Sequence, residues 1–211
     1  MPAGAATYAV VGEVIPTLQG WCTVEKASHL ADLVVDRGAG VCVEVGVFGG
    51  RSLLAMAFAQ RELGRGATWG IDPWSAVASL EGENSPENDE WWSQLDYEDV
   101  YRRFVEAVLQ HGLLPVCNWM RTKSVTASRL FDDRTVNVLH IDGNHSEFTS
   151  VTDVVTWLPK MSPGGIVVMD DADWATTAAA QRLLRQHSSS VDDRGSYAVF
   201  TLADVSSPAA D

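Results

Sequence analysis

The chain has 211 residues, of which 46% are hydrophobic and 20% charged, and its formal net charge is −13. This length and composition predict one soluble globular domain. The acidic balance argues against binding to nucleic acid or to an anionic membrane surface, because both need clustered lysine and arginine. No signal peptide and no membrane-spanning helix is expected. The three cysteines lack the spacing of zinc ligands, so we expect reduced thiols in a cytoplasmic protein.

Apolar periodicity predicts strands that alternate with helices along the chain. Thr23 is expected to cap a helix that runs to about Asp36, and further helices are expected over about 52–63, 101–111, 148–158 and 176–186. The expected strands span 41–45, 68–71, 115–120, 136–141, 166–170 and 197–202. Pro163, Gly164 and Gly165 are expected to form the turn into the strand that ends at Asp170. The alternation indicates βαβ units and a mostly parallel sheet within a single domain, 1–211.

Two segments lie outside this alternation. Residues 1–20 are weakly patterned and are expected to form an N-terminal arm or a short helix. Residues 75–99 are polar and acidic and contain Trp91, Trp92 and Tyr97. A long insert of this kind inside a compact domain is usually functional, so we expect a lid over a substrate site. Its aromatic side chains would suit the face of a sugar or an aromatic ring, although packing within the lid or a dimer contact would also explain them.

Two apolar, strand-like runs end in acidic residues. The run 136–141 leads into Asp142, with His145 three residues later, and the run 166–169 leads into Asp170 and Asp171. In open α/β sheets, ligands bind just outside the carboxyl ends of the strands. Carboxylates that gather at such an edge repel one another unless they share a cation. The alternative is that Asp142 caps a turn and that Asp171 and Asp173 are surface acids before a helix.

A glycine-rich loop joins the first predicted strand to its helix, within the sequence Glu44-Val-Gly-Val-Phe-Gly-Gly-Arg-Ser52. Glycines allow a sharp turn and a close approach of the backbone to a ligand, and the helix that follows offers free N–H groups. Phe48 stands where a dinucleotide fingerprint has its second glycine, which argues against that cofactor class. Asp72 ends the second strand, where a carboxylate can accept hydrogen bonds from ribose hydroxyls.

These motifs, followed by Gly-Ile-Asp72-Pro-Trp74, resemble class I S-adenosylmethionine-dependent methyltransferases over roughly residues 20–174. The pattern is most similar to metal-dependent small-molecule O-methyltransferases of the catechol and caffeoyl-CoA type and to sugar O-methyltransferases of natural-product pathways. The resemblance implies a Rossmann-like, seven-stranded, mostly parallel sheet with helices on both faces and an antiparallel last strand. It also implies a cofactor site, built from Glu44, Gly46, Phe48, Gly49, Gly50, Ser52, Asp72, Lys123, Ser124 and Asp142.

The same resemblance implies a divalent metal, Mg²⁺ or a similar ion, bound by Asp142, Asp170 and Asp171, with water or Asn144 completing the shell. Such a cation would lower the pKa of an acceptor hydroxyl. His145 is the expected general base, in a position where the catechol-type enzymes have lysine. A metal-free enzyme that relies on His145 alone also stays open. His140, inside a strand, is expected to be a hydrogen-bonded core histidine.

The expected function is therefore methyl transfer to a hydroxyl of a small molecule, a sugar or glycosylated secondary metabolite first and a phenol second. Trp91, Trp92 and Trp174 are the expected acceptor-binding side chains, and a homodimer is plausible. Two alternatives remain: a metal-independent N-methyltransferase, and a non-catalytic module that binds a nucleotide or a partner on the same fold.

Overall fold

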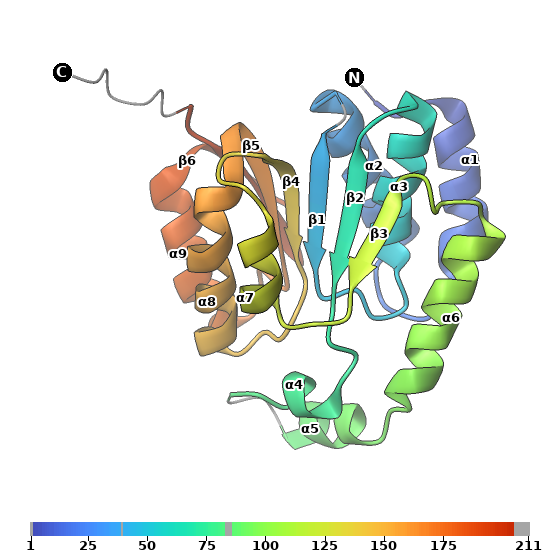
Figure 1. Ribbon diagram of the computed structural model, residues 1–211. Coiled ribbons are helices and arrows are strands. Elements are labelled where there is room, and N and C mark those ends of the chain that lie inside the picture. The colour runs from blue at the N-terminus through green and yellow to red at the C-terminus, as the bar shows by residue number, and fades with distance from the viewer. Residues whose placement is uncertain (1, 39, 83–85, 205–211) are drawn as a thin grey trace.

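The computed structural model describes residues 2–38, 40–82 and 86–204. Within these residues a seven-stranded sheet has the order β3-β2-β1-β4-β5-β7-β6 (Figure 1). The strands are β1 (Val41–Val45), β2 (Ala67–Ile71), β3 (Cys117–Met120), β4 (Val136–Ile141), β5 (Met161–Asp170), β6 (Ser188–Asp193) and β7 (Tyr197–Leu202). Strand β7 runs antiparallel to both of its neighbours, whereas the pairs from β3 to β5 are parallel. The Rossmann-like fold with an antiparallel last strand is therefore confirmed.

Helices cover both faces of the sheet (Figure 1). One face packs against α1 (Ala5–Val14), α2 (Val24–Asp36), α3 (Arg51–Leu63) and α6 (Tyr97–Gln110). The other face packs against α7 (Ser124–Ala127), α8 (Glu147–Trp157) and α9 (Ala178–His187). Short 3-10 turns lie at Ile15–Thr17, Ser128–Leu130, Leu158–Lys160 and Ala175–Thr177. None of the helices in the described part of the chain is long and apolar enough to cross a membrane.

The alternation of side chains along the strands divides the interior into two cores. In β4, Val138 joins the core under α2 and α3, while Leu139 and Ile141 join the core under α8 and α9. Successive side chains of a strand point to opposite faces, so a run that is apolar throughout can fill both cores. Glu44 of β1 and His140 of β4 are partners in register and are fully buried. They are the fully buried polar side chains of these two mostly apolar strands.

Several predicted elements agree with the structure, and others need correction. The helix capped by Thr23 is α2, and the Thr23 hydroxyl accepts a hydrogen bond from the Lys26 amide. Helix α6 begins at Tyr97, four residues before the predicted start, because Asp96 caps it. The expected turn at 163–165 is wrong, since β5 extends from Met161 through it with an irregular register opposite β4. Strand β6 was not predicted, because its serines and aspartates lack an apolar pattern.

The polar insert lies beyond the carboxyl ends of the central strands (Figure 1). It contains α4 (Ala76–Ser79) and α5 (Pro86–Ser93), while residues 83–85 fall outside the described part. The side chain of Asn144, which follows β4, donates hydrogen bonds to the carbonyl oxygens of Ser79, at 2.9 Å, and Glu81, at 2.8 Å. The insert is thus tied to the loop that carries Asp142 and His145.

Candidate active site

A cavity of about 890 Å³ opens at the carboxyl ends of the strands. Its walls come from the N-terminal segment, the glycine loop, the insert and the loops that follow β2, β3, β4 and β5. Thirteen predicted site residues line it: Gly46, Phe48, Ser52, Asp72, Trp91, Trp92, Lys123, Ser124, Asp142, His145, Asp170, Asp171 and Trp174. Three others, Glu44, Gly49 and Gly50, do not line it. The cavity therefore brings together residues that are far apart in the sequence.

The glycine loop needs glycine at its first turn. Gly46 has a φ of +86°, and a Cβ atom there would lie 2.0 Å from the carbonyl oxygen of Asp142. The β1–α3 and β4–α8 connections thus meet backbone to backbone. Gly50, with a φ of +87°, precedes the first turn of α3 and lies against the ring of Phe104. Phe48 has a φ of +50°, which is uncommon for a residue other than glycine. This backbone angle sets the direction of its carbonyl group and its ring within the loop.

Asp72 stabilises the glycine loop. Its Oδ2 accepts hydrogen bonds from the amides of Val47, at 2.9 Å, and Phe48, at 3.0 Å, and its Oδ1 accepts one from the amide of Trp74. Burial raises the pKa of Asp72, and these three hydrogen bonds oppose that shift. Oδ1 accepts only one of these bonds, so it retains acceptor capacity toward the cavity.

Glu44 and Ser52 connect β1 to the first turn of α3. The Ser52 hydroxyl donates a hydrogen bond to Oε1 of Glu44. Glu44 is fully buried, and burial raises the pKa of its carboxyl group well above the usual value. Ser52 lines the cavity, and its hydroxyl oxygen still offers acceptor lone pairs there. A direct role for Ser52 in holding a ligand carboxylate stays a prediction.

The loop after β3 provides the side wall of the cavity. Lys123 forms an ion pair with Glu81 of the insert. The hydroxyl of Ser124 accepts a hydrogen bond of 2.7 Å from the indole of Trp157. Lys123 therefore fastens the insert over the cavity, while Ser124 is fixed at the start of α7. The predicted proximity of both residues to an adenine ring is not tested by these contacts.

The three acids predicted to share a cation do lie together, and Lys26 of α2 lies with them. Its ammonium nitrogen is 2.5 Å from Oδ2 of Asp170 and 3.9 Å from Oδ2 of Asp142. The Lys26 side chain is 7% exposed. Sequence reasoning missed this residue, although Lys26 precedes Leu30 by four positions and therefore lies beside the apolar face of its helix. The third acid, Asp171, has a φ of +46°, and its Oδ2 lies 3.1 Å from Nε2 of His145.

The charges in this group shift one another strongly. Burial lowers the pKa of Lys26, but the charges of Asp142 and Asp170 outweigh burial and raise it. Burial raises the pKa of Asp170, but Lys26 and its neighbours lower it to about 2. Burial and the charge of Asp170 raise the pKa of Asp142 to about 7. The distance of 2.5 Å and the lowered pKa of Asp170 both indicate that Asp170 and Lys26 are a charged pair near neutral pH.

His145 lies beside the other acids, at the cavity wall. Its Nε2 is 3.1 Å from Oδ2 of Asp171 and 3.6 Å from Oδ1 of Asp142. Burial lowers the pKa of His145, but hydrogen bonding to Asp142 and the charges of the nearby acids reverse this and raise it. The ring of Trp174 stands edge-on to the imidazole, with centroids 5.6 Å apart. The predicted base, acids and aromatic residue are thus in one place.

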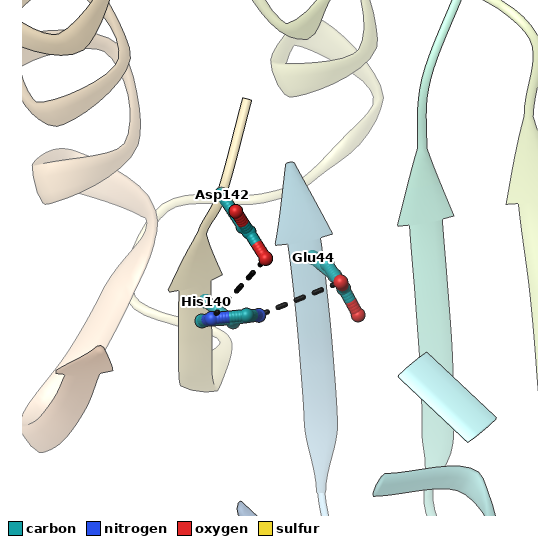
Figure 2. Close-up of side chains that lie close together, drawn as sticks. All are labelled: Glu44, His140 and Asp142. Carbon is teal, nitrogen blue, oxygen red and sulfur yellow. Dashed lines mark ion pairs between the residues drawn. The ribbon is translucent and has the colours of Figure 1, made fainter. Parts of the chain in front are cut away.

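His140 lies below this group and is not the hydrogen-bonded core histidine that the sequence predicts. Figure 2 shows its ring between Glu44 and Asp142, with Nδ1 3.5 Å from Glu44 and Nε2 3.9 Å from Asp142. Neither nitrogen has a hydrogen-bond partner among the described residues. Burial lowers the pKa of His140 well below the usual value, and the charge of Lys26 adds to that effect. The imidazole is therefore neutral.

The acidic group does not fit an open site for Mg²⁺. Such an ion takes oxygen ligands at about 2.0–2.1 Å in octahedral geometry. One oxygen of Asp170 already contacts the ammonium of Lys26, and Asn144 uses its amide for the insert and its Oδ1 for the Ser146 amide. Glu44, His140 and Asp142 also offer ligand atoms within 4.8 Å of one another, but an ion there would lie beside the same ammonium. We therefore assign no part of the chemistry at this site to a metal ion.

Four aromatic side chains form one wall of the cavity. Trp21 stacks on Phe48 with ring centroids 5.3 Å apart, and it meets Trp91 at 4.9 Å and Trp92 at 5.9 Å. These rings come from the N-terminal segment, the glycine loop and the insert. Trp21 is 63% exposed and Trp91 41%, so ring faces remain available. Sequence reasoning found Trp91 and Trp92 but missed Trp21, which precedes the first recognised motif.

Arg51 holds the N-terminal segment in this position. Its guanidinium donates hydrogen bonds to the carbonyl oxygens of Leu18, at 2.8 Å, and Cys22, at 3.2 Å. Arg51 is the first residue of α3, immediately after the glycine loop. The loop and Trp21 are therefore positioned by the same helix terminus.

Comparison with known proteins is consistent with this arrangement. Residues 43–172 match a family described as a methyltransferase domain. No sequence among the curated proteins matches the chain. Similar folds occur in the O-methyltransferase NovP (16% identity, TM-score 0.64, 87% of this chain and 83% of NovP) and in TomG of Streptomyces achromogenes (13%, 0.62, 96% and 92%). A methyltransferase of Podospora anserina, bound to S-adenosylhomocysteine, is also similar (14%, 0.60, 97% and 90%).

Proposed function

The chain belongs to the methyltransferase domain family, and from that premise we propose that it methylates a hydroxyl group of a small molecule with S-adenosylmethionine. The observation that carries this proposal is the cavity, which joins the glycine loop to His145 and the acids. Its volume of about 890 Å³ is large enough for a cofactor together with an acceptor. TomG, a structural neighbour that is an O-methyltransferase, was determined with S-adenosylmethionine bound.

The glycine-loop end suits the cofactor. We assign the methionine part to the backbone of Gly46 and Phe48 and to Ser52, and the ribose to the free acceptor position of Asp72. Glu44, Gly49 and Gly50 shape this loop without facing the cavity, and Lys123 and Ser124 form the wall on the adenine side. When bound, S-adenosylmethionine supplies an electrophilic methyl group on a positively charged sulfur.

The acidic end suits an acceptor hydroxyl. In its neutral form, His145 directs Nε2–H toward the carboxylates of Asp142 and Asp171, so Nδ1 carries the lone pair that takes the hydroxyl proton. Those two carboxylates stabilise the imidazolium that forms, and they hold the ring in one orientation. Lys26 neutralises Asp170, so the acceptor oxygen is not surrounded by unpaired negative charge. A positioned base of this kind contributes about 10²–10⁴-fold to a rate.

The aromatic wall suits an acceptor with a flat or ring-shaped face. Trp21, Trp91 and Trp92 offer ring faces, and Trp174 stands beside His145. A sugar ring presents C–H groups to such faces and hydroxyls to carboxylates, so we propose a sugar or a glycosylated metabolite as the acceptor, with a phenol as the second class.

A methyl-transfer assay over sugars, phenols and amines, combined with calorimetry of S-adenosylhomocysteine, tests the proposal. We expect S-adenosylhomocysteine to bind and methyl ethers to form. Methylation of amines alone would favour N-methyl transfer. A folded chain that binds the nucleotide and methylates no acceptor would favour a non-catalytic binding module, and failure to bind it would remove the cofactor assignment.

A further inference from the structure

We propose that the ammonium group of Lys26 takes the place of a divalent cation between Asp142 and Asp170, so that the acidic site works without a metal ion. The inference deepens the proposed function and rests on it, because it concerns the site to which the acceptor hydroxyl is assigned. Its test uses metal binding rather than turnover.

The surroundings of the Lys26 ammonium resemble a built cation site. Asp170 and Asp142 face it at 2.5 and 3.9 Å, and the ring of Tyr197 lies 5.5 Å away, within reach of a cation–π contact. Asp142 follows β4, Asp170 ends β5 and Tyr197 begins β7, so three strands converge on a side chain from α2. A charge this deeply buried persists only when it is paired, and here each neighbouring strand supplies a partner.

The helix fixes where the ammonium can reach. Thr23 caps α2 by accepting the Lys26 amide at 3.1 Å, so Lys26 is held in the first turn. The residues that follow it on the same helix, Ala27 and Leu30, are fully buried in the core. The lysine chain therefore extends between helix and sheet toward the acids, not into solvent.

A divalent ion bound to Asp170 would meet this ammonium at close range. With ligand bonds of about 2.1 Å, an ion on the same oxygen would lie within about 5 Å of the Lys26 nitrogen. The remaining acid, Asp171, faces His145 at 3.1 Å. The chain's own side chains thus supply a positive or hydrogen-bonding partner to each of the three carboxylates. Lys26 acts as a positioning residue, because it orients Asp142 and Asp170 and leaves His145 to meet the acceptor.

Titration with Mn²⁺, followed by calorimetry and by the electron paramagnetic resonance of free Mn²⁺, tests this inference on the full chain. We expect Asp170→Asn to leave Mn²⁺ binding as it is in the wild type, because Lys26 already occupies the cation position at Asp170. Binding that survives Asp170→Asn would lie at other acids and would agree with the inference. Binding in the wild type that Asp170→Asn removes would overturn it.

The variant Lys26→Met tests whether the ammonium of Lys26 is what keeps Mn²⁺ from binding at Asp170. Removal of the ammonium leaves the carboxylates without their cation, so we expect Mn²⁺ to bind at least about tenfold more tightly than to the wild type and to raise the melting temperature. The matched control is Lys160→Met, which removes a lysine from its ion pair with the exposed Asp133 and should leave Mn²⁺ affinity unchanged. A folded Lys26→Met chain that gains no Mn²⁺ affinity would overturn the inference. If this variant does not fold, the wild-type titration still decides.

Failure of this inference is distinguishable from failure of the proposed function. Calorimetry of S-adenosylhomocysteine on the same preparations reports on the cofactor site at the glycine loop, and Lys26 is not among the residues that line the cavity. Loss of that binding in the wild type would refute the proposed function and leave the Mn²⁺ result valid. Lys26→Arg should bind Mn²⁺ no more tightly than the wild type does, because a guanidinium also carries a positive charge.

Discussion

The two ends of the cavity are built in different ways. At the glycine-loop end, the shape depends on backbone: Gly46 lies against the backbone of the neighbouring connection, and Asp72 holds two loop amides. At the acidic end, the shape depends on charged side chains that come from helices and strands far apart in the sequence, with Lys26 and His145 balancing three carboxylates. The first end depends on turn glycines that the sequence shows directly, whereas the second depends on charged side chains that meet only once the chain has folded.

This difference predicts that substitutions at the acidic end lower the rate of methyl transfer and leave the affinity for the cofactor unchanged. We expect His145→Ala to lower turnover by about 10²–10⁴-fold while leaving the affinity for S-adenosylhomocysteine unchanged, because the imidazole faces the acceptor. Wild-type turnover should rise with pH through a midpoint above 6.5, because the base form is needed and nearby acids raise the pKa of His145. Steady-state rates and calorimetry measure both effects. Full turnover in His145→Ala would dismiss the residue as the base.

Stability should also depend most on the acidic end. Asp170→Asn leaves the buried ammonium of Lys26 without its main partner, so we expect a loss of about 3–5 kcal/mol in the free energy of unfolding. The pKa of Asp170 is lowered to about 2, so the ion pair stabilises the wild type above pH 4, and this stabilisation is lost as the pH falls through 2. Urea unfolding of the wild type and the variant at several pH values measures these free energies.

The control for that variant is Asp133→Asn, which breaks the exposed pair with Lys160. Exposed pairs contribute little, so the unfolding free energy should hardly change. Equal losses in the two variants would contradict the account of Lys26 as a buried partner.

At the other end, Gly46→Ala should weaken cofactor binding. Its Cβ atom would lie 2.0 Å from a backbone oxygen, and its φ of +86° is strained for alanine. We expect the affinity for S-adenosylhomocysteine to fall at least about tenfold, because backbone strain of this kind alone costs about 1–3 kcal/mol. Gly64→Ala is the matched control, since Gly64 has a φ of +66° and open space around it. Binding by Gly46→Ala at wild-type strength would show that the loop is not the cofactor site.

The smallest effect is expected at the aromatic wall. Trp91→Ala should raise the KM for the acceptor by about two- to tenfold, since aromatic contacts contribute about 0.5–1.5 kcal/mol beyond buried area, while S-adenosylhomocysteine affinity stays constant. Leu130→Ala, at an exposed residue that does not line the cavity, serves as the control. An unchanged acceptor KM would place the acceptor elsewhere in the cavity.

The same contrast explains how much could be predicted from the sequence. The glycine loop, Asp72 and the acid-ended strands were found because parallel strands bring their carboxyl ends to one edge. Lys26 and Trp21 were missed, because their roles come from the packing of α2 and the N-terminal segment against that edge, which no local pattern encodes. The position of His140 between Glu44 and Asp142 was missed for the same reason.

The most direct test of the central claim is the transfer of labelled methyl from S-adenosylmethionine to a panel of sugar and phenol acceptors, with and without EDTA. The account predicts methyl ethers at the same rate in both conditions, because Lys26 supplies the positive charge that a metal would otherwise provide. Absence of any methyl ether, with methylation confined to amines, would contradict the assigned reaction. A rate that falls to background on chelation would contradict the role given to Lys26.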